Sequence, residues 1–215
     1  MVVAALTMIG ALDLRVCELL TARLCHELTG PIGAVGNGVE LLDEGDPDFV
    51  GDVLTLVRDS ARRAANRLRF YRFCYGFSGN AAIAGPAPCE LAAALFDGVP
   101  PIVCDFTERV RALPLDQQKL GCNLILVGAE ALGRGGQLVL DTAATGLQLE
   151  VIRQSASLTA EQAAALRLET PIGAVTPQTV QAYFAGLLAQ ACGWRLAAAA
   201  PEPGRFRLYS IESGV

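Results

Sequence analysis

The sequence has a single histidine, His26, and its seven cysteines form no C-x-x-C pair. A zinc site needs clustered cysteine and histidine ligands, and a disulfide framework needs an even number of cysteines at regular spacings. We therefore exclude both, and expect no metal ligand on this chain. Free thiols suit a reducing cytosol, so the sequence predicts a cytoplasmic protein.

Long apolar runs and a basic excess are missing as well. No run reaches the roughly eighteen uncharged apolar residues that a membrane-spanning helix needs, and the apolar start lacks the basic region of a signal peptide. The net charge of −5 argues against a dedicated nucleic-acid binder. We expect neither a membrane nor a nucleic acid as partner. With 52% hydrophobic residues the chain is a folded globular protein.

Two long helical patterns fill the first third of the chain. The spacing predicts one helix over residues 13–44, with Asp13 as N-cap, and a second to about Tyr75, with Asp46 as N-cap and Pro47 at its first position. Each has a seam of small and apolar residues spaced by three and four, and apolar residues flank both seams. Two helices joined by a short turn form an antiparallel hairpin. Two such hairpins would bury these wide stripes in a four-helix bundle, so we expect a homodimer. The first seam comprises Leu14, Cys17, Thr21, Leu24, Leu28, Pro31, Val35, Gly38 and Leu42.

The pattern changes after a Gly-, Ala- and Pro-rich stretch at residues 76–88, which indicates a linker. Strand patterns follow at 102–106, 137–142, 147–153 and 206–211, and helical patterns at 90–96, 116–132, 159–166 and 178–192. Their mixture without strict alternation predicts an α+β fold. We therefore expect a hairpin domain over residues 1–80 and an α/β sandwich over residues 86–215.

The register of the first seam places His26 on the side of the helix that points away from it. The residues that share its face are mostly small, and Gly30 and Gly33 each cost about 1 kcal/mol relative to alanine. An open patch around a nucleophile would explain that cost, although tight helix packing would explain it too. Pro31 predicts a bend just after His26.

Charged residues around His26 suggest how it would work. Glu27 could orient the imidazole, as the third member of a catalytic triad does, or be an ordinary helix carboxylate. Six arginines of the second helix lie off its seam, where they would hold an acidic partner or pair with carboxylates such as Asp59. The aromatic residues near the end of this helix, from Phe70 to Phe77, would pack against the second domain. We take His26 and Glu27 as candidate catalytic residues, and Arg23, Thr29, Gly30, Gly33, Asn37, Arg62 and Arg69 as candidate partner-binding residues.

The run from Leu24 to Pro31, LCHELTGP, resembles the H-box of sensor histidine kinases. The longer stretch CHELTGPIGAVGNGVELLDEG is similar to the ChpT-type histidine phosphotransferases of alphaproteobacteria. The resemblance implies a dimeric four-helix bundle followed by a degenerate copy of the kinase ATP-binding domain. In many kinases the residue four after the histidine is polar and takes part in receiver dephosphorylation; here it is Gly30, which argues against phosphatase activity.

The second domain departs from the kinase pattern where nucleotide would bind. Asn123 matches the first asparagine of the kinase N-box, but Val127 stands where the magnesium-binding asparagine would be. The sequences QSAS at 154–157 and VTPQ at 175–178 replace the adenine-reading and glycine-rich phosphate loops. Without these glycines and this ligand, backbone amides cannot approach a triphosphate. We expect no ATP and no cofactor on this chain.

The resemblance implies a phosphorelay function. His26 would accept a phosphoryl group from the receiver domain of a hybrid kinase and pass it to a response regulator, with the magnesium ion held by the receiver. The alternatives are an ATP-using kinase, opposed by the missing loops, and a dimeric adaptor that binds receivers without chemistry.

Overall fold

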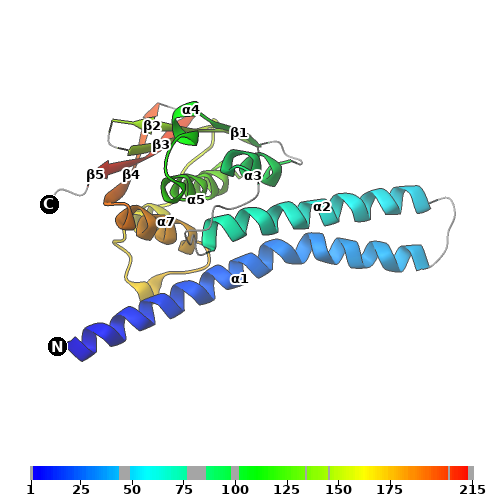
Figure 1. Ribbon diagram of the computed structural model, residues 1–215, viewed down its shortest axis with the longest axis horizontal. Helices are drawn as coiled ribbons and strands as arrows, with labels where there is room; N and C mark the ends of the chain where they lie inside the picture. The colour runs from blue at the N-terminus through cyan, green and yellow to red at the C-terminus, as the bar shows by residue number, and fades with distance from the viewer. Residues whose placement is uncertain are drawn as a thin grey trace.

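The structure is a computed structural model that describes residues 2–43, 49–76, 86–97, 102–133, 135–144, 146–202 and 204–212. Two antiparallel helices, α1 (Val2–Asp43) and α2 (Val50–Tyr75), precede a domain in which one sheet packs against helices (Figure 1). The α+β class and the two-layered second domain are therefore as predicted. The predicted boundary between residues 80 and 86 stays a prediction, because residues 77–85 lie outside the described ranges.

Helix α1 is longer than the sequence pattern indicated. It begins at Val2, so the predicted N-cap at Asp13 is wrong. Aspartate costs only a fraction of a kcal/mol inside a helix, and the Ala- and Leu-containing residues before it extend the helix. The helix continues through Pro31. Figure 1 shows its axis bending partway along, which agrees with the bend predicted from the proline.

Helix α2 begins at Val50 after an N-cap residue, Phe49, that offers no side-chain hydrogen bond. The predicted cap at Asp46 and the predicted first position at Pro47 lie outside the described residues. The helix ends at Tyr75, as predicted, because Gly76 takes an extended conformation (φ −70°, ψ 159°).

A five-stranded sheet forms one layer of the second domain, in the order β1-β2-β3-β5-β4. Strand β1 pairs parallel with β2, and the other neighbours are antiparallel. The strands are β1 (Ile102–Phe106), β2 (Gly136–Ala143), β3 (Gly146–Ile152), β4 (Trp194–Glu202) and β5 (Arg205–Glu212). Four of them were predicted. Strand β4 was missed because its alanine run, residues 197–200, carries no alternation of apolar and polar residues.

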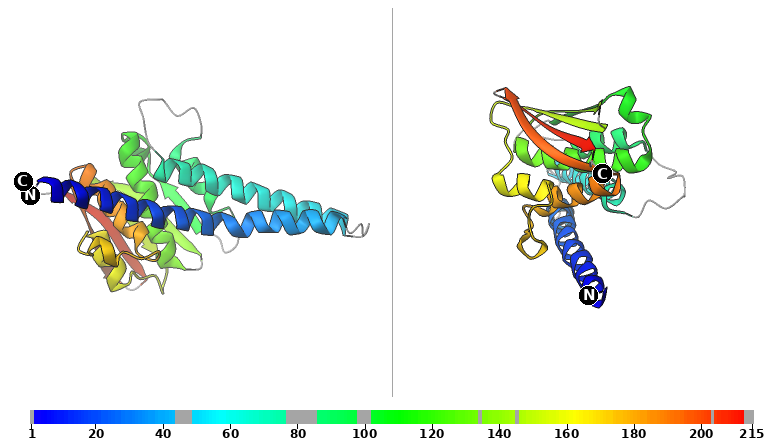
Figure 2. Two further views of the ribbon diagram at one scale, coloured as in Figure 1. Left: turned by 90° about the horizontal axis from the view of Figure 1, so that it is seen from below. Right: turned by 90° about the vertical axis from the view of Figure 1, so that its left-hand side faces the viewer.

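Helices cover one face of this sheet (Figures 1 and 2). They are α3 (Pro88–Leu95), α4 (Glu108–Arg111), α5 (Leu115–Leu132), α6 (Ala160–Leu166), a 3₁₀ turn (Ile172–Ala174) and α7 (Val180–Ala191). The short α4 and the 3₁₀ turn were not predicted, since four- and three-residue segments show no periodicity. The four longer helices were.

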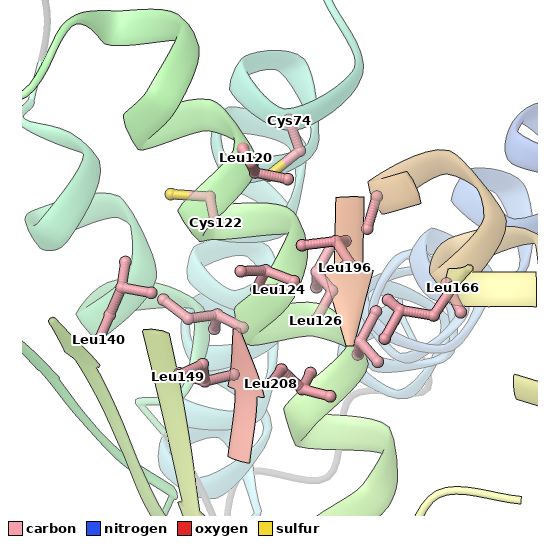
Figure 3. Close-up of a cluster of buried hydrophobic side chains, with 14 of the residues drawn as sticks. Cys74, Leu120, Cys122, Leu124, Leu126, Leu140, Leu149, Leu166, Leu196 and Leu208 are labelled. Atoms are coloured by element: carbon pink, nitrogen blue, oxygen red, sulfur yellow. The ribbon is translucent and has the colours of Figure 1, made fainter. Parts of the chain in front are cut away.

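The core lies between α5 and the sheet, where leucines alternate along the strands (Figure 3). Two glycines let α5 come close to the strands. A Cβ at Gly121 would lie 2.5 Å from Leu140 Cδ2, and one at Gly128 would lie 2.8 Å from Leu149 Cδ2. The buried strand residues include Leu138, Leu140, Leu147, Leu149, Val151, Phe206 and Leu208.

The first half of α1 packs on the second domain through residues beside the predicted seam. Val16, Leu19 and Leu20 are buried in the shared core, whereas the seam residues Leu14, Cys17 and Thr21 are exposed in the single chain. The burial of this seam between two hairpins stays a prediction. In the structure the first half of α1 meets α7 and the 3₁₀ turn, and only the second half runs beside α2. The buried stripe therefore shifts around the helix between the two halves.

The end of α2 enters the core of the second domain. Phe70, Tyr71 and Phe73 are 0%, 3% and 7% exposed, which confirms the predicted packing of these aromatic residues. Tyr75 stacks on Tyr71, with ring centroids 5.3 Å apart, and meets the edge of Phe184 of α7. Phe77 lies outside the described residues.

Buried polar groups fix the same helix end. Asn123 Nδ2 of α5 donates to the carbonyl of Cys74 (3.2 Å), and Lys119 Nζ donates to the carbonyl of Gly76 (2.5 Å). Gln181 of α7 donates to Asn123 Oδ1 (3.0 Å) and accepts from the Tyr75 hydroxyl (2.6 Å). Each bond satisfies a group that would be costly to bury alone, so α2 is held by both α5 and α7.

Gly38 lets the C-terminal part of α1 lie close to α2. A Cβ at this position would sit 2.4 Å from Val57 Cγ2, and valine in a helix has one strongly preferred rotamer. An added Cβ at Gly36, two residues earlier, meets nothing within 4 Å.

These two glycines should respond oppositely to alanine. We expect Gly38→Ala to lower the free energy of unfolding by about 1–3 kcal/mol through overpacking, and Gly36→Ala to raise it by up to about 1 kcal/mol through helix propensity. Urea denaturation at one fixed protein concentration measures both. Equal shifts for the two variants would contradict the close packing at Gly38.

Candidate functional site

His26 lies near the middle of α1 and its side chain is exposed, as its register predicted. Ala22, Thr29, Gly30 and Gly33 lie three to seven positions away, and all four are exposed. Residues at these spacings share one face of a helix. The structure therefore brings His26 and three of its predicted partner-binding neighbours onto one surface.

The glycines beside His26 leave that surface open. An added Cβ at Gly30, Gly33 or Gly36 meets nothing within 4 Å, in contrast to Gly38. Tight packing within this chain thus accounts for Gly38 and not for Gly30 or Gly33. A bare stretch of helix beside an exposed nucleophile allows another protein surface to approach it closely.

The Thr29 hydroxyl bonds locally. Thr29 Oγ1 donates to the carbonyl of Cys25 at 2.8 Å, a bond within the helix that favours a bend. Pro31 follows two residues later and is buried. Thr29 and Pro31 together shape the turn just after His26.

Arg23 lies one turn before His26 and points into the second domain. Its Nη2 forms an ion pair with Glu130 Oε1 at the end of α5, and the two side chains are only 14% and 22% exposed. The predicted partner-binding role of Arg23 remains a prediction, since its guanidinium is here engaged within the chain.

Burial affects both members of this pair. The pKa of Glu130 is raised because burial outweighs the attraction of Arg23. Burial works to lower the pKa of Arg23, but the combined charges of Glu130, two tyrosines and Glu27 raise it. The raised pKa of Arg23 keeps the guanidinium charged, so Glu130 is the member that loses its charge as the pH falls.

The Glu27 carboxylate turns toward α2. Its Oε2 lies 3.5 Å from Arg67 Nε, and both side chains are about one third exposed (30% and 31%). Adjacent residues of a helix do not face one another, and among the described contacts Glu27 forms no hydrogen bond with His26. The orienting role predicted for Glu27 therefore stays a prediction that this conformation does not display.

The other predicted partner-binding residues are spread over the hairpin. Asn37 is exposed on α1, beyond Gly33. Arg62 of α2 approaches Asp59 (3.4 Å) and Asp97 (3.9 Å), which is the carboxylate pairing considered as an alternative. Arg69 donates to Asn66 Oδ1 at 3.4 Å and lines a mostly apolar groove with Leu24, Ala65, Leu68, Tyr71 and Tyr75. His26 is not part of that groove.

The residues that stand where a kinase binds nucleotide have other partners here. The Asn123 amide holds the end of α2, and the Val127 side chain is fully buried. In the loop before α7, the Thr176 amide donates to Thr179 Oγ1 at 3.0 Å. Arg15 of α1 donates to the neighbouring carbonyl of Val175 at 3.3 Å.

Two residues of this region escaped the sequence reasoning: Glu130 and Gln181. Each acts through a contact between elements far apart in sequence, and no local motif marks such contacts. Within the described ranges, no three His, Cys, Asp or Glu side chains gather as a metal site. A search of the same residues found no helix with the length and apolarity to cross a membrane.

Comparisons with known proteins agree on one family. The family model for the histidine phosphotransferase C-terminal domain matches residues 90–204, more than half of the chain. The chain is 39% identical over 137 residues to the protein phosphotransferase ChpT of Brucella abortus (strain 2308), an alignment that spans 61% of this chain and 62% of that protein. It also matches a solved structure described as a bacterial phosphotransferase, with a TM-score of 0.71 and 30% identity, over 91% of this chain and 96% of the other.

Proposed function

The chain belongs to the histidine phosphotransferase family, and we propose that it carries a phosphoryl group on His26 in a two-component phosphorelay. The observation that supports this most is the exposed histidine on a stretch of helix that Gly30 and Gly33 leave bare. Among the candidate residues, His26 is the one whose side chain is a nucleophile near neutral pH. A receiver domain is the partner class that donates phosphoryl groups to such a histidine.

The proposed chemistry is a balanced exchange of bonds. An unprotonated imidazole nitrogen of His26 attacks the phosphorus of an aspartyl phosphate, the N–P bond forms, and the O–P bond breaks to leave the aspartate carboxylate. The proton on the other ring nitrogen stays in place. A second receiver, on a response regulator, takes the phosphoryl group by the reverse of these steps. Magnesium belongs to the receiver in this proposal, and this chain contributes positioning.

We propose that the second domain needs no nucleotide. The buried Val127 offers no metal ligand, and Asn123 already holds α2. Gly30 supplies no polar side chain for receiver dephosphorylation, so we propose transfer without phosphatase activity. We further propose a cytoplasmic location, because all seven cysteines are free.

We also propose that two copies form the four-helix bundle. Large apolar residues are exposed on both helices of the hairpin: Leu14 (62%) and Ile32 (56%) on α1, and Leu54 (51%) and Leu68 (51%) on α2. The apolar groove that includes Leu24 and Leu68 continues this stripe. A second hairpin would cover it, and the register of α1 keeps His26 off the covered side.

The transfer proposal predicts that a phosphorylated receiver labels the wild-type chain with acid-labile phosphate and does not label His26→Gln. Labelled phosphate is followed on both chains after mixing. Receiver binding to His26→Gln should persist, because glutamine leaves the glycine surface intact. A labelled His26→Gln chain would place the phosphate elsewhere, and no label on either chain, with binding retained, would favour the adaptor.

Glu27→Gln belongs in the same experiment. If Glu27 orients the ring during transfer, this variant loses about tenfold or more in rate, a typical contribution of a positioned acid–base partner. If Glu27 only pairs with Arg67, the rate changes little and the stability falls by less than about 1 kcal/mol, the range of partly exposed ion pairs.

The dimer proposal predicts that Leu68→Lys yields monomers, because it places a charge in the covered stripe. Sedimentation velocity measures the mass. The matched control is Leu115→Lys, at an exposed leucine (43%, against 51% for Leu68) at the start of α5, which should leave the dimer intact. A monomeric wild type, or a dimeric Leu68→Lys, would contradict the proposed interface.

A further inference from the structure

We infer that Glu130 is a positioning residue for the transfer at His26: through its ion pair with Arg23 it sets how the histidine turn of α1 faces the second domain. This inference rests on the proposed function. Glu130 ends α5, more than a hundred residues after His26 in sequence, and its partner lies only three residues before the histidine.

The ion pair continues into the second domain by directed bonds. The other oxygen of Glu130, Oε2, accepts from Gln162 Nε2 of α6 at 3.3 Å. Gln162 and Thr159 form the capping box at the start of α6, with both backbone-to-side-chain bonds at 3.1 Å. A continuous path thus joins the turn of His26 to the ends of two helices in the second domain.

The apolar contacts of α1 cannot set this orientation alone. Val16, Leu19 and Leu20 bury the helix on the domain, but apolar burial is non-directional and tolerates small rotations of a helix about its axis. A partly buried ion pair holds two opposite charges at a short separation, because moving them apart costs electrostatic energy. The Arg23–Glu130 pair therefore selects one rotation of α1, and with it the direction in which His26 points.

A second polar tie on α1, Arg15 to the carbonyl of Val175, lies two turns earlier. On the far side of His26, α1 runs beside α2, and the Glu27–Arg67 pair joins these two helices. Among the described polar contacts between α1 and the second domain, the Glu130 tie lies nearest His26, so its loss would act on the histidine turn first. A rotation of α1 about its axis would weaken the binding of a receiver that contacts both α1 and the second domain.

The test compares Glu130→Gln with the matched control Glu150→Gln. Glu150 also forms a partly buried ion pair, with Arg207 at 2.6 Å, but on the sheet and away from α1. Transfer from a phosphorylated receiver is measured against receiver concentration, and amide hydrogen exchange is measured over the peptide that contains His26. Both variants are compared with the wild type and with the His26→Gln blank.

We expect Glu130→Gln to raise the receiver concentration for half-maximal transfer about fivefold, with the saturating rate within about twofold of wild type, as loss of a coupling between contacting residues implies. Exchange around His26 should quicken as well. Glu150→Gln should change neither. The reversed pair, Arg23→Glu with Glu130→Arg, should recover part of the affinity that Arg23→Glu alone loses, because it restores the attraction between the two side chains.

Unchanged half-saturation and exchange in Glu130→Gln would overturn the inference, as would equal effects of Glu150→Gln. A different result bears on the proposed function alone. If the wild type accepts no phosphate but Glu130→Gln still quickens exchange around His26, the phosphotransfer proposal fails while the Arg23–Glu130 tie stands.

Discussion

The side-chain amide of Asn123 holds the end of α2 inside the second domain, and the geometry of the chain depends on this contact. Its Nδ2 bonds the carbonyl of Cys74, while its Oδ1 accepts from Gln181, which also accepts from the Tyr75 hydroxyl. Asn123 and Gln181 are fully buried, so each missing bond would leave a polar group without water, at a cost of about 1–3 kcal/mol. The hairpin is thus fixed at the C-terminal end of α2. Helix α1 is then positioned by its packing on α2 and α7.

Asn123 serves the packing of the hairpin on the second domain. Asn123 matches an N-box asparagine, yet its hydrogen-bonding groups are occupied by the chain itself. Lys119, one turn earlier, likewise bonds the carbonyl of Gly76. The polar groups of α5 therefore hold the hairpin and the second domain in one arrangement. A protein that receives and passes a phosphoryl group through docking benefits from such a fixed frame, because less orientational freedom is lost at each encounter.

The sequence was informative wherever a pattern was local. Strand β1 was predicted at its observed bounds, and the exposure of His26 followed from counting along the helix. The packing of Val16, Leu19 and Leu20 on the second domain was not predicted, since helical periodicity cannot tell which of two partners a face meets. Arg23 was expected to contact a partner protein and instead pairs with Glu130, and Glu27 lies beside Arg67. Neither pair was predicted, because ion pairs between distant segments leave no mark in sequence spacing. The register already separated Gly38, a seam residue, from Gly33, which shares the face of His26, and their surroundings agree with it.

The central claim is that this frame presents the face of His26, Gly30 and Gly33 to a receiver domain. The most direct measurement is a nuclear magnetic resonance footprint of an unlabelled receiver, activated with beryllofluoride as a stable mimic of aspartyl phosphate, on the isotope-labelled chain. We expect chemical-shift changes centred on residues 22–37 of α1, with smaller ones at the end of α5 and the start of α6. A footprint on the uncovered face of the sheet, with α1 unperturbed, would contradict it.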